Sequence, residues 1–270
     1  MKIVVSALVL MALAALGAAA FVRSGLYDIS ATDQHLAPTY WLLDTTMKYS
    51  VKRRGERIDV PDLDDAAKIA RGVSLYRAHC EHCHGAPGVA PEPFALGMTP
   101  APVPLVHTAR AWPPAEVFWV VKEGIKMTGM PAWKFRMTDE DIWAVVAFLP
   151  AMARMTPQQY RETKSQSPER SKPEIPADPD AERGRKAIEQ YACVTCHAIP
   201  GVVGPNFPVG PPLAGVGSRT MLGGVLSNSP ENMARWLRTP QAFAPLTAMP
   251  NLGLSERDAR DIAAFLATLK

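Results

Sequence analysis

Two pentapeptides in this chain have the residue types and spacing that attach haem covalently. They are CEHCH, residues 80–84, and CVTCH, residues 193–197, and together they contain all four cysteines of the 270-residue sequence. Cysteines three positions apart lie on one face of a helical turn, so both sulfurs reach one edge of a porphyrin and the adjoining histidine projects beneath the ring. The motifs therefore predict two covalently bound haem c groups. The expected thioether donors and proximal iron ligands are Cys80, Cys83, Cys193, Cys196, His84 and His197.

Disulfide bonding and zinc binding are the two other uses that these cysteines could have. A disulfide framework leaves both adjoining histidines unexplained, and a chain of this length does not need covalent staples for stability. A zinc site built from the two C-x-x-C pairs is the other alternative. More than a hundred residues separate the pairs, whereas zinc knuckles usually lie closer together. Haem is the interpretation that accounts for all four cysteines and both adjoining histidines.

The N-terminus carries an apolar stretch long enough to cross a bilayer. After Lys2, residues 3–22 contain no charge, and Arg23 ends the run. We expect residues 1–23 to form an uncleaved signal anchor or transmembrane helix. A signal peptide cleaved at the alanine triplet 18–20 is the alternative. Either interpretation places the haem domains on the periplasmic or extracytoplasmic side of the inner (cytoplasmic) membrane.

Composition divides the rest of the chain into two domains and two connecting segments. Residues 24–65 are polar with scattered aromatics and predict a stalk. Its Tyr40, Trp41 and Tyr49 either lie near the membrane interface or pack onto the first domain. Residues 156–180 are rich in proline and charge, show no core-forming pattern, and predict a flexible linker.

The expected domains, residues 66–155 and 181–270, form an internal repeat. Each begins with a helix that carries an Arg-Gly pair and runs into its haem motif; these helices are predicted over 64–78 and 181–191. Each ends with a helix that starts at a capping-box pattern. The paired capping residues are Thr138 with Asp141 and Ser255 with Asp258.

A glycine in each opening helix would let it cross the closing helix closely. We expect Gly72 to lie against the region of Trp143 or Phe148, and Gly184 to lie against Phe265.

Charge excludes one class of partner. The formal net charge is +3 and the basic residues form no dense stripe, so the sequence has no nucleic-acid footprint. The basic run at Lys52, Arg53, Arg54 and Arg57 is interpreted as a solvated charged segment, with lipid head groups or an acidic partner as the alternative.

Each half resembles a class I cytochrome c domain, with an N-terminal helix, C-x-x-C-H, loops, a methionine-bearing segment and a C-terminal helix. The resemblance implies an all-α fold of two tandem cytochrome c domains behind the N-terminal helix. It also implies that a methionine is the sixth ligand of each haem iron. Such a ligand raises the reduction potential of the haem, which suits electron transfer.

The expected sixth ligands are Met130, in the segment GIKMTGMPAW, and Met249, in TAMPNLGLS. A proline after the methionine fixes the turn, and in the first segment a glycine lets the backbone pass close to the porphyrin. The rivals are Met127, Met98 and His107 in the first half and Met221 and Met233 in the second.

The second half matches the family's haem pocket further, through GPPLAGVGSR. The resemblance implies that the Pro211 carbonyl accepts a hydrogen bond from His197, and that Leu213 packs on the ring. Arg219 and Trp236 are expected to meet the propionates, with core filling as the alternative for Trp236. In the first half PAPVPL departs from this pattern and offers Pro102 or Pro104 as the imidazole partner.

The resemblance implies an electron-transfer protein rather than an enzyme, with redox proteins as partners. The second half resembles cytochrome domains fused to haem-copper oxidases, so we expect electrons to pass to or within a respiratory chain that ends in such an oxidase. An electron-acceptor subunit of a periplasmic dehydrogenase is the main alternative. A di-haem peroxidase is a further alternative. A peroxidase needs an iron with a free coordination position, so a methionine ligand at each of the two irons argues against it.

Overall fold

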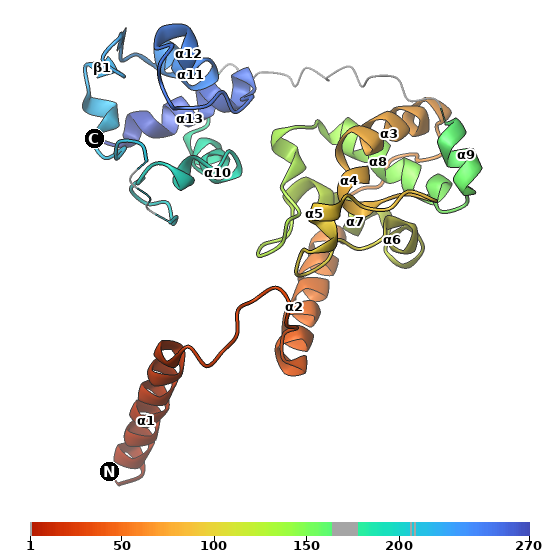
Figure 1. The fold of residues 1–270 in the computed structure, drawn as a ribbon, viewed down its shortest axis with the longest axis horizontal. Helices are drawn as coiled ribbons and strands as arrows, with labels where there is room; N and C mark the ends of the chain where they lie inside the picture. Colours follow the sequence, from red (N-terminus) through yellow and green to blue (C-terminus); the bar gives the residue numbers. More distant parts are fainter. Residues whose placement is uncertain (1, 164–177, 206, 208) are drawn as a thin grey trace.

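Helices account for most of the chain. The computed structural model describes residues 2–163, 178–205, 207 and 209–270, apart from the side chains of His107 and Ala109. It is 57% helix and 2% strand, which confirms the predicted all-α class. Figure 1 shows an N-terminal helix followed by two helical bodies.

The elements follow the order expected for two repeats. The N-terminal extension and the first domain contain α1 (Lys2–Ser24), α2 (Ala37–Gly55), α3 (Ala66–His79), α4 (Glu81–His84), α5 (Pro93–Leu96), α6 (Leu105–Ala111), α7 (Pro114–Glu123), the 3-10 turn η1 (Trp133–Phe135), α8 (Asp139–Met152) and α9 (Pro157–Glu162). The second domain contains α10 (Ala181–Gln190), η2 (Cys193–Thr195), η3 (Val216–Ser218), β1 (Met221–Leu222), β2 (Leu226–Ser227), α11 (Pro230–Arg238), α12 (Pro240–Phe243) and α13 (Glu256–Thr268).

The closing helices begin where the capping patterns place them. The Thr138 hydroxyl accepts the Asp141 backbone N–H at 3.2 Å at the start of α8, and the Ser255 hydroxyl accepts the Asp258 N–H at 3.0 Å at the start of α13. Each bond satisfies one of the N–H groups that a helix start leaves without an intrahelical partner. Both predicted helix starts are confirmed.

The opening and closing helices of each domain cross at a glycine. A Cβ on Gly72 would lie 2.1 Å from the Ala144 carbonyl oxygen and 2.8 Å from Phe148 Cβ, so the expected contact with the Phe148 region is confirmed. A Cβ on Gly184 would lie 2.0 Å from the Asp261 carbonyl oxygen. The expected contact with Phe265 was therefore wrong by about one helical turn.

An ion pair beside each glycine explains where the helices cross. Arg71 lies 2.5 Å from Asp141, and Arg183 lies 2.6 Å from Asp258 and 2.5 Å from Asp261. All three carboxylates are buried, so a charged partner is needed to offset their desolvation. In the second domain the pair holds α10 at the first turns of α13, which is why Gly184 meets Asp261.

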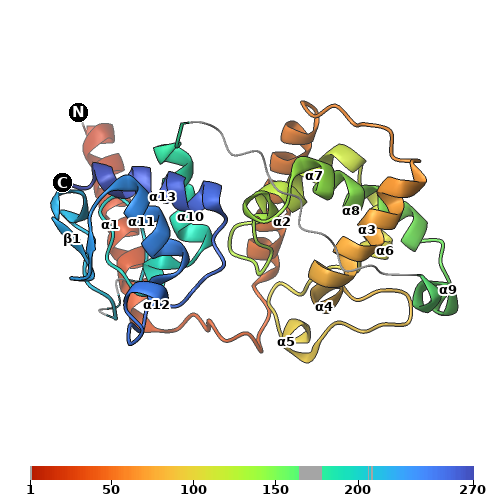
Figure 2. The same cartoon turned by 90° about the horizontal axis from the view of Figure 1, so that it is seen from above.

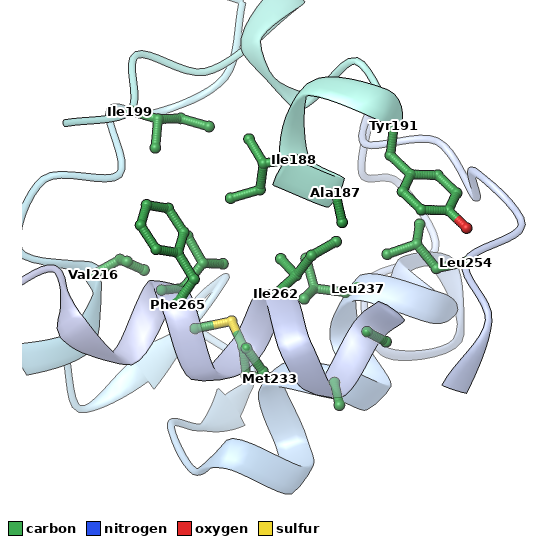
Figure 3. Packing of buried hydrophobic residues seen from close by; sticks show 14 of the residues in the cluster. Ala187, Ile188, Tyr191, Ile199, Val216, Met233, Leu237, Leu254, Ile262 and Phe265 are labelled. Carbon is green, nitrogen blue, oxygen red and sulfur yellow. The ribbon is translucent and has the colours of Figure 1, made fainter. Parts of the chain in front are cut away.

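Each domain has its own hydrophobic core. In the first, Tyr76 and Phe148 are fully buried with an edge-to-face contact at 5.6 Å between ring centres. In the second, Ile188 from α10 meets Ile262 and Phe265 from α13 (Figure 3). The only β-strands among the described residues form the hairpin β1–β2, which pairs Met221 with Ser227 and Leu222 with Leu226.

The expected stalk contains a helix that belongs to the first domain. Helix α2 packs against α7: Val51 is buried, and a Cβ on Gly55 would lie 2.7 Å from Glu116 Cγ. Arg54, from the basic run, stacks over the Trp119 ring at 5.4 Å. The prediction of a simple stalk over 24–65 was wrong for this part, because one valine on a largely polar helix is a weak burial signal.

The aromatics of that segment do not pack onto the first domain. Tyr40, Trp41 and Tyr49, all on α2, are between 61% and 71% exposed. Of the two expected positions for these side chains, packing against the domain is thus excluded.

The linker predicted over residues 156–180 starts within a part of the chain that the structure shows to be folded. Residues 156–162 form a capping box and helix α9, and Tyr160 is buried in the first core. Arg77 donates to the Tyr160 and Thr163 carbonyls, and the Tyr160 hydroxyl donates to Glu81. This helix was not predicted because Tyr160 is the only aromatic residue among polar ones, so the segment has no apolar periodicity. Residues 164–177 of the expected linker lie outside the described residues.

Candidate haem sites

The first C-x-x-C-H motif forms one helical turn. The backbone N–H groups of Cys83 and His84 donate to the Cys80 carbonyl at 3.1 and 3.0 Å, and Cys80 is the N-cap of α4. A helical turn places the two cysteines, three positions apart, on one face. Cys80 is buried, which raises the pKa of its thiol to about 12, while His82 between the cysteines is exposed as expected.

The second motif repeats the turn as a short 3-10 helix. The His197 N–H donates to the Cys193 carbonyl at 3.0 Å, matching the bond from His84 to Cys80. Burial raises the pKa of the Cys193 thiol to about 11. In both motifs burial therefore favours the neutral form of the first cysteine's free thiol.

Each proximal histidine is oriented by a loop carbonyl. His197 Nδ1 lies 2.8 Å from the Pro211 carbonyl oxygen, as the resemblance implied. His84 Nδ1 lies 2.8 Å from the carbonyl oxygen of Val103, the residue between the two prolines that were expected. The choice of Pro102 or Pro104 was wrong because a carbonyl acceptor needs no particular side chain, so composition could not identify it.

The hydrogen bond fixes which ring nitrogen can bind a metal. With Nδ1 paired to a carbonyl, Nε2 is the nitrogen left as a ligand in each histidine. Burial lowers the pKa of His84, which favours the neutral imidazole that iron requires.

Glycine brings the backbone against the second imidazole. A Cβ on Gly210 would lie 2.5 Å from Cε1 and 2.8 Å from Nδ1 of His197. The Gly210 N–H in turn donates to the Cys196 carbonyl at 2.8 Å, and the Leu213 N–H donates to the Ala198 carbonyl at 2.9 Å. The loop is thus fastened to the haem motif on both sides of Pro211.

The segment that carries Met130 is a closed loop. Gly124 begins it with φ +69°, and a Cβ there would lie 2.7 Å from the Met130 carbonyl oxygen. The Ile125 N–H donates to that same carbonyl at 3.2 Å. Met130 packs, partly buried, on the first core, whereas Met127 is 85% exposed. Of these two methionines, Met130 is thus the one that packs on the core of the first domain, and its role as an iron ligand stays a prediction.

A threonine two residues before each methionine holds the two segments in the same way. The Met130 N–H donates to Thr128 Oγ1 at 3.1 Å, and the Met249 N–H donates to Thr247 Oγ1 at 3.2 Å. Met249 also packs, partly buried, on the second core. Sequence reasoning missed both threonines, although the repeated pattern Thr-x-Met-Pro was a visible signal.

The rivals for the sixth ligand are placed differently. Met98 lies close enough to the first methionine loop that a Cβ on Gly129 would stand 2.9 Å from its sulfur. Met233 is buried in the second core, and Met221 lies on the hairpin strand β1. The side chain of His107 lies outside the described residues.

The other expected pocket residues lie around the second motif. Leu213 and Trp236 are partly buried against the second core, and Trp236 packs on the hairpin glycine Gly223. Arg219 is exposed and donates to the carbonyls of Pro212 and Ala214 at 2.6 and 3.2 Å. It thus holds the loop that orients His197, and its expected contact with a propionate stays a prediction.

The residues present in each domain fit a covalently attached haem. All four cysteines are free thiols, so none is used in a disulfide. Each domain also contains one histidine whose Nδ1 is paired with a carbonyl, which leaves Nε2 available as a ligand, and one methionine on a separate loop. The described residues contain no cluster of three or more His, Cys, Asp or Glu side chains suited to a bare metal ion. The donor set is therefore that of haem iron rather than of zinc.

Comparison with known families identifies both halves. Residues 67–149 match the family model described as cytochrome c oxidase, cbb3-type, subunit III, and residues 181–270 match the cytochrome c model. The chain belongs to the c-type cytochromes, as two cytochrome c domains in tandem. Cytochrome c domains carry covalently bound haem c and transfer electrons.

Curated relatives match over a shorter part of the chain. "Cytochrome c oxidase subunit 2" of Alkalihalophilus pseudofirmus is 34% identical over 98 residues, which is 36% of this chain and 28% of that protein. "Cytochrome c oxidase subunit 2" of Bacillus sp. (strain PS3) is 30% identical over 106 residues, 37% of this chain and 29% of that protein. The chain thus spans less than a third of the length of these relatives.

Proposed function

We propose that this protein is a membrane-tethered di-haem cytochrome c that relays single electrons to or within a respiratory chain ending in a haem-copper oxidase. The observation that carries the proposal is the repetition of one arrangement in both domains. In each, a histidine with Nδ1 held at 2.8 Å by a loop carbonyl is matched by a methionine whose N–H is held by a threonine.

In the proposed sites the chain provides the groups that would attach each haem and the two ligands that would bind its iron. Cys80, Cys83, Cys193 and Cys196 would attach the two haems, and His84 and His197 would each bind one iron through Nε2. Met130 and Met249 would each supply a second ligand through sulfur. A bound haem contributes a one-electron couple at its iron, and thioether ligation raises the potential of that couple. With a histidine and a methionine both bound to each iron, no coordination position would be open to a substrate, and this favours electron transfer over bond chemistry.

The proposed location rests on α1. This helix has 23 residues, is apolar and long enough to cross a membrane, and has no buried residue. A signal sequence passes the same test. We propose that it is retained as an anchor in the inner membrane, with both haem domains on the periplasmic side.

The proposed link to an oxidase is supported by a family model and by two curated relatives. The family model matched by the first domain is named for a cbb3-type oxidase subunit, and two curated relatives are named as oxidase subunits. The described chain lacks a cysteine pair apart from the haem motifs, so a copper centre of the two-cysteine kind is not expected in it. We propose that the protein passes electrons to such an oxidase or acts as one of its subunits.

An optical redox titration of the purified protein tests the two sites. Two one-electron waves with positive midpoints are expected, together with the thioether-to-iron absorption band in the oxidised state. A high-spin haem that binds carbon monoxide on reduction would contradict methionine ligation at that site.

The partner is tested separately by mixing the reduced protein with a haem-copper oxidase and following haem c oxidation together with oxygen uptake. Oxidation that stops on addition of cyanide is expected. If the oxidase takes no electrons while a periplasmic dehydrogenase reduces the protein rapidly, the oxidase role is wrong and the acceptor-subunit role holds.

A further inference from the structure

A short segment of the first domain is buried in the second. Ala132 and Phe135, which follow the Met130 loop, are 4% and 5% exposed and belong to the same hydrophobic cluster as Ile188 and Tyr191. The loop between α7 and α8 adjoins α10 in Figures 1 and 2. The two cytochrome domains are therefore in contact as well as joined along the chain.

Three hydrogen bonds fasten this segment to the end of α10. The Ala132 N–H donates to Gln190 Oε1 at 3.2 Å, and Arg136 Nη2 donates to the Gln190 carbonyl oxygen at 2.9 Å. The Tyr191 hydroxyl lies 3.1 Å from the Phe135 carbonyl oxygen. We call these five residues the interdomain contact.

Charged groups stack on both rings of the interdomain contact. The Arg136 guanidinium lies 5.3 Å from the centre of the Tyr191 ring, and the Arg183 guanidinium lies 5.1 Å from the centre of the Phe135 ring. Such contacts are stabilising when partly desolvated. The Tyr191 hydroxyl is also 2.7 Å from Asp258, the carboxylate that Arg183 pairs with. The first domain is thus docked onto the ion pair that joins α10 to α13.

In the sequence, the interdomain contact adjoins both the Met130 loop of the first domain and the C-x-x-C-H motif of the second. Ala132 follows Met130 by two residues, and Tyr191 precedes Cys193 by two residues. A path of covalent bonds with one hydrogen bond, from the Ala132 N–H to Gln190, therefore connects the expected iron ligand of the first site to a thioether donor of the second.

We propose that single electrons pass between the two haem sites across the interdomain contact, and that Gln190 and Arg136 are the residues that position it. The inference rests on the proposed function. In this step one iron goes from ferrous to ferric while the other goes from ferric to ferrous, and no proton or atom is transferred. Electron tunnelling weakens steeply with separation, so a docked contact beside both ligands would be the favourable crossing point.

The test uses the full chain with both haems and three variants. The double variant Arg136→Ala/Gln190→Ala removes the Arg136 bond, its stacking on Tyr191 and the acceptor for Ala132. Gln190→Glu keeps an acceptor oxygen at the same position. Glu189→Ala changes an exposed neighbour on the same helix and is the matched control.

Two readouts are combined. Hydrogen exchange at residues 132–136 and small-angle scattering report docking, and the rate of internal electron equilibration after pulsed one-electron reduction reports transfer. The double variant is expected to exchange faster, to expand and to equilibrate severalfold more slowly, with both midpoint potentials unchanged. Gln190→Glu and Glu189→Ala are expected to behave like the unmodified protein.

Two results would overturn the inference. If the double variant exchanges and scatters like the unmodified protein, these residues do not hold the domains together. If it is undocked yet equilibrates at the original rate, electrons cross elsewhere. The internal rate needs no partner protein, so its outcome is independent of whether an oxidase accepts the electrons.

Discussion

One hydrogen bond at the histidine of each C-x-x-C-H motif leaves Nε2 as the ring nitrogen available to a metal. The acceptor is a backbone carbonyl in both domains, Pro211 in one and Val103 in the other, at the same distance of 2.8 Å. Because the acceptor is backbone, the two pockets reach the same geometry with different sequences. The same holds on the opposite side, where Thr128 and Thr247 hold the two methionine segments.

At the residue scale, removing a methionine ligand should open one iron only. We predict that Met130→Ala and Met249→Ala each lower the midpoint potential of one haem by roughly 0.2 V and allow that haem to bind carbon monoxide when reduced. The measurement is an optical redox titration with and without carbon monoxide.

The matched controls are Met127→Ala in the first domain and Met221→Ala in the second, whose side chains are 85% and 43% exposed. Both midpoints should stay at their original values in these variants. Equal shifts from Met127→Ala and Met130→Ala would contradict the ligand assignment in the first domain.

At the element scale, the closest approach in each domain is between two helix backbones. A methyl group on Gly72 or Gly184 would stand 2.1 or 2.0 Å from a carbonyl oxygen of the facing helix. Backbone atoms of a helix cannot shift as an exposed side chain can, so the two helices would have to separate.

We predict that Gly72→Ala and Gly184→Ala each destabilise the domain that carries them by ~2 kcal/mol, as expected for overpacking at a rigid contact. Thermal unfolding should show this as a decrease in Tm of roughly 10 °C. Gly97→Ala is the control, since nothing lies within 4 Å of its Cβ position and its φ of −92° suits alanine. An unchanged Tm for both crossing variants would show that the helices adjust without cost.

Helix α9 gives a second element-scale prediction, because it lies in a segment whose composition indicates a linker. Tyr160→Ala should destabilise the first domain by about 3–5 kcal/mol through loss of a buried ring. Tyr160→Phe should cost only about 1 kcal/mol, since it keeps the ring and loses the bond to Glu81. Denaturant unfolding measures both values.

The control for this pair is Gln158→Ala, an exposed position on the same helix. If Tyr160→Ala were as mild as this control, α9 would not contribute to the core of the first domain.

At the scale of the whole molecule, α1 determines whether the haem domains stay at the membrane. We predict that the mature protein keeps residues 2–24, remains in the membrane fraction after carbonate washing and is released by detergent. Intact-mass measurement of the purified protein checks the N-terminus directly. A mature chain that begins at Phe21, after the alanine triplet, would show that α1 is a cleaved signal.

Replacing Ala18 and Ala20 by leucine provides the control. The double substitution removes the small residues that cleavage requires and keeps the helix apolar, so a retained anchor should give the same membrane fraction with and without it.

The sequence by itself predicted the features that depend on local spacing. Two C-x-x-C-H motifs fixed the haem-attachment turns, and capping residues fixed the starts of α8 and α13, because a helical turn places residues three and four apart together whatever surrounds it. The segments containing Met130 and Met249 were found through a family resemblance carried by the same kind of local pattern.

Only the tertiary structure decided the contacts between distant segments. The Val103 carbonyl, the Arg183–Asp261 pair, the burial of Tyr160 and the docking of Phe135 in the second core all join residues at least 19 positions apart or depend on what packs beside them. A backbone carbonyl has no sequence signature, and a single aromatic in a polar segment has no periodicity. Such contacts are therefore determined by how the helices pack, which local patterns do not record.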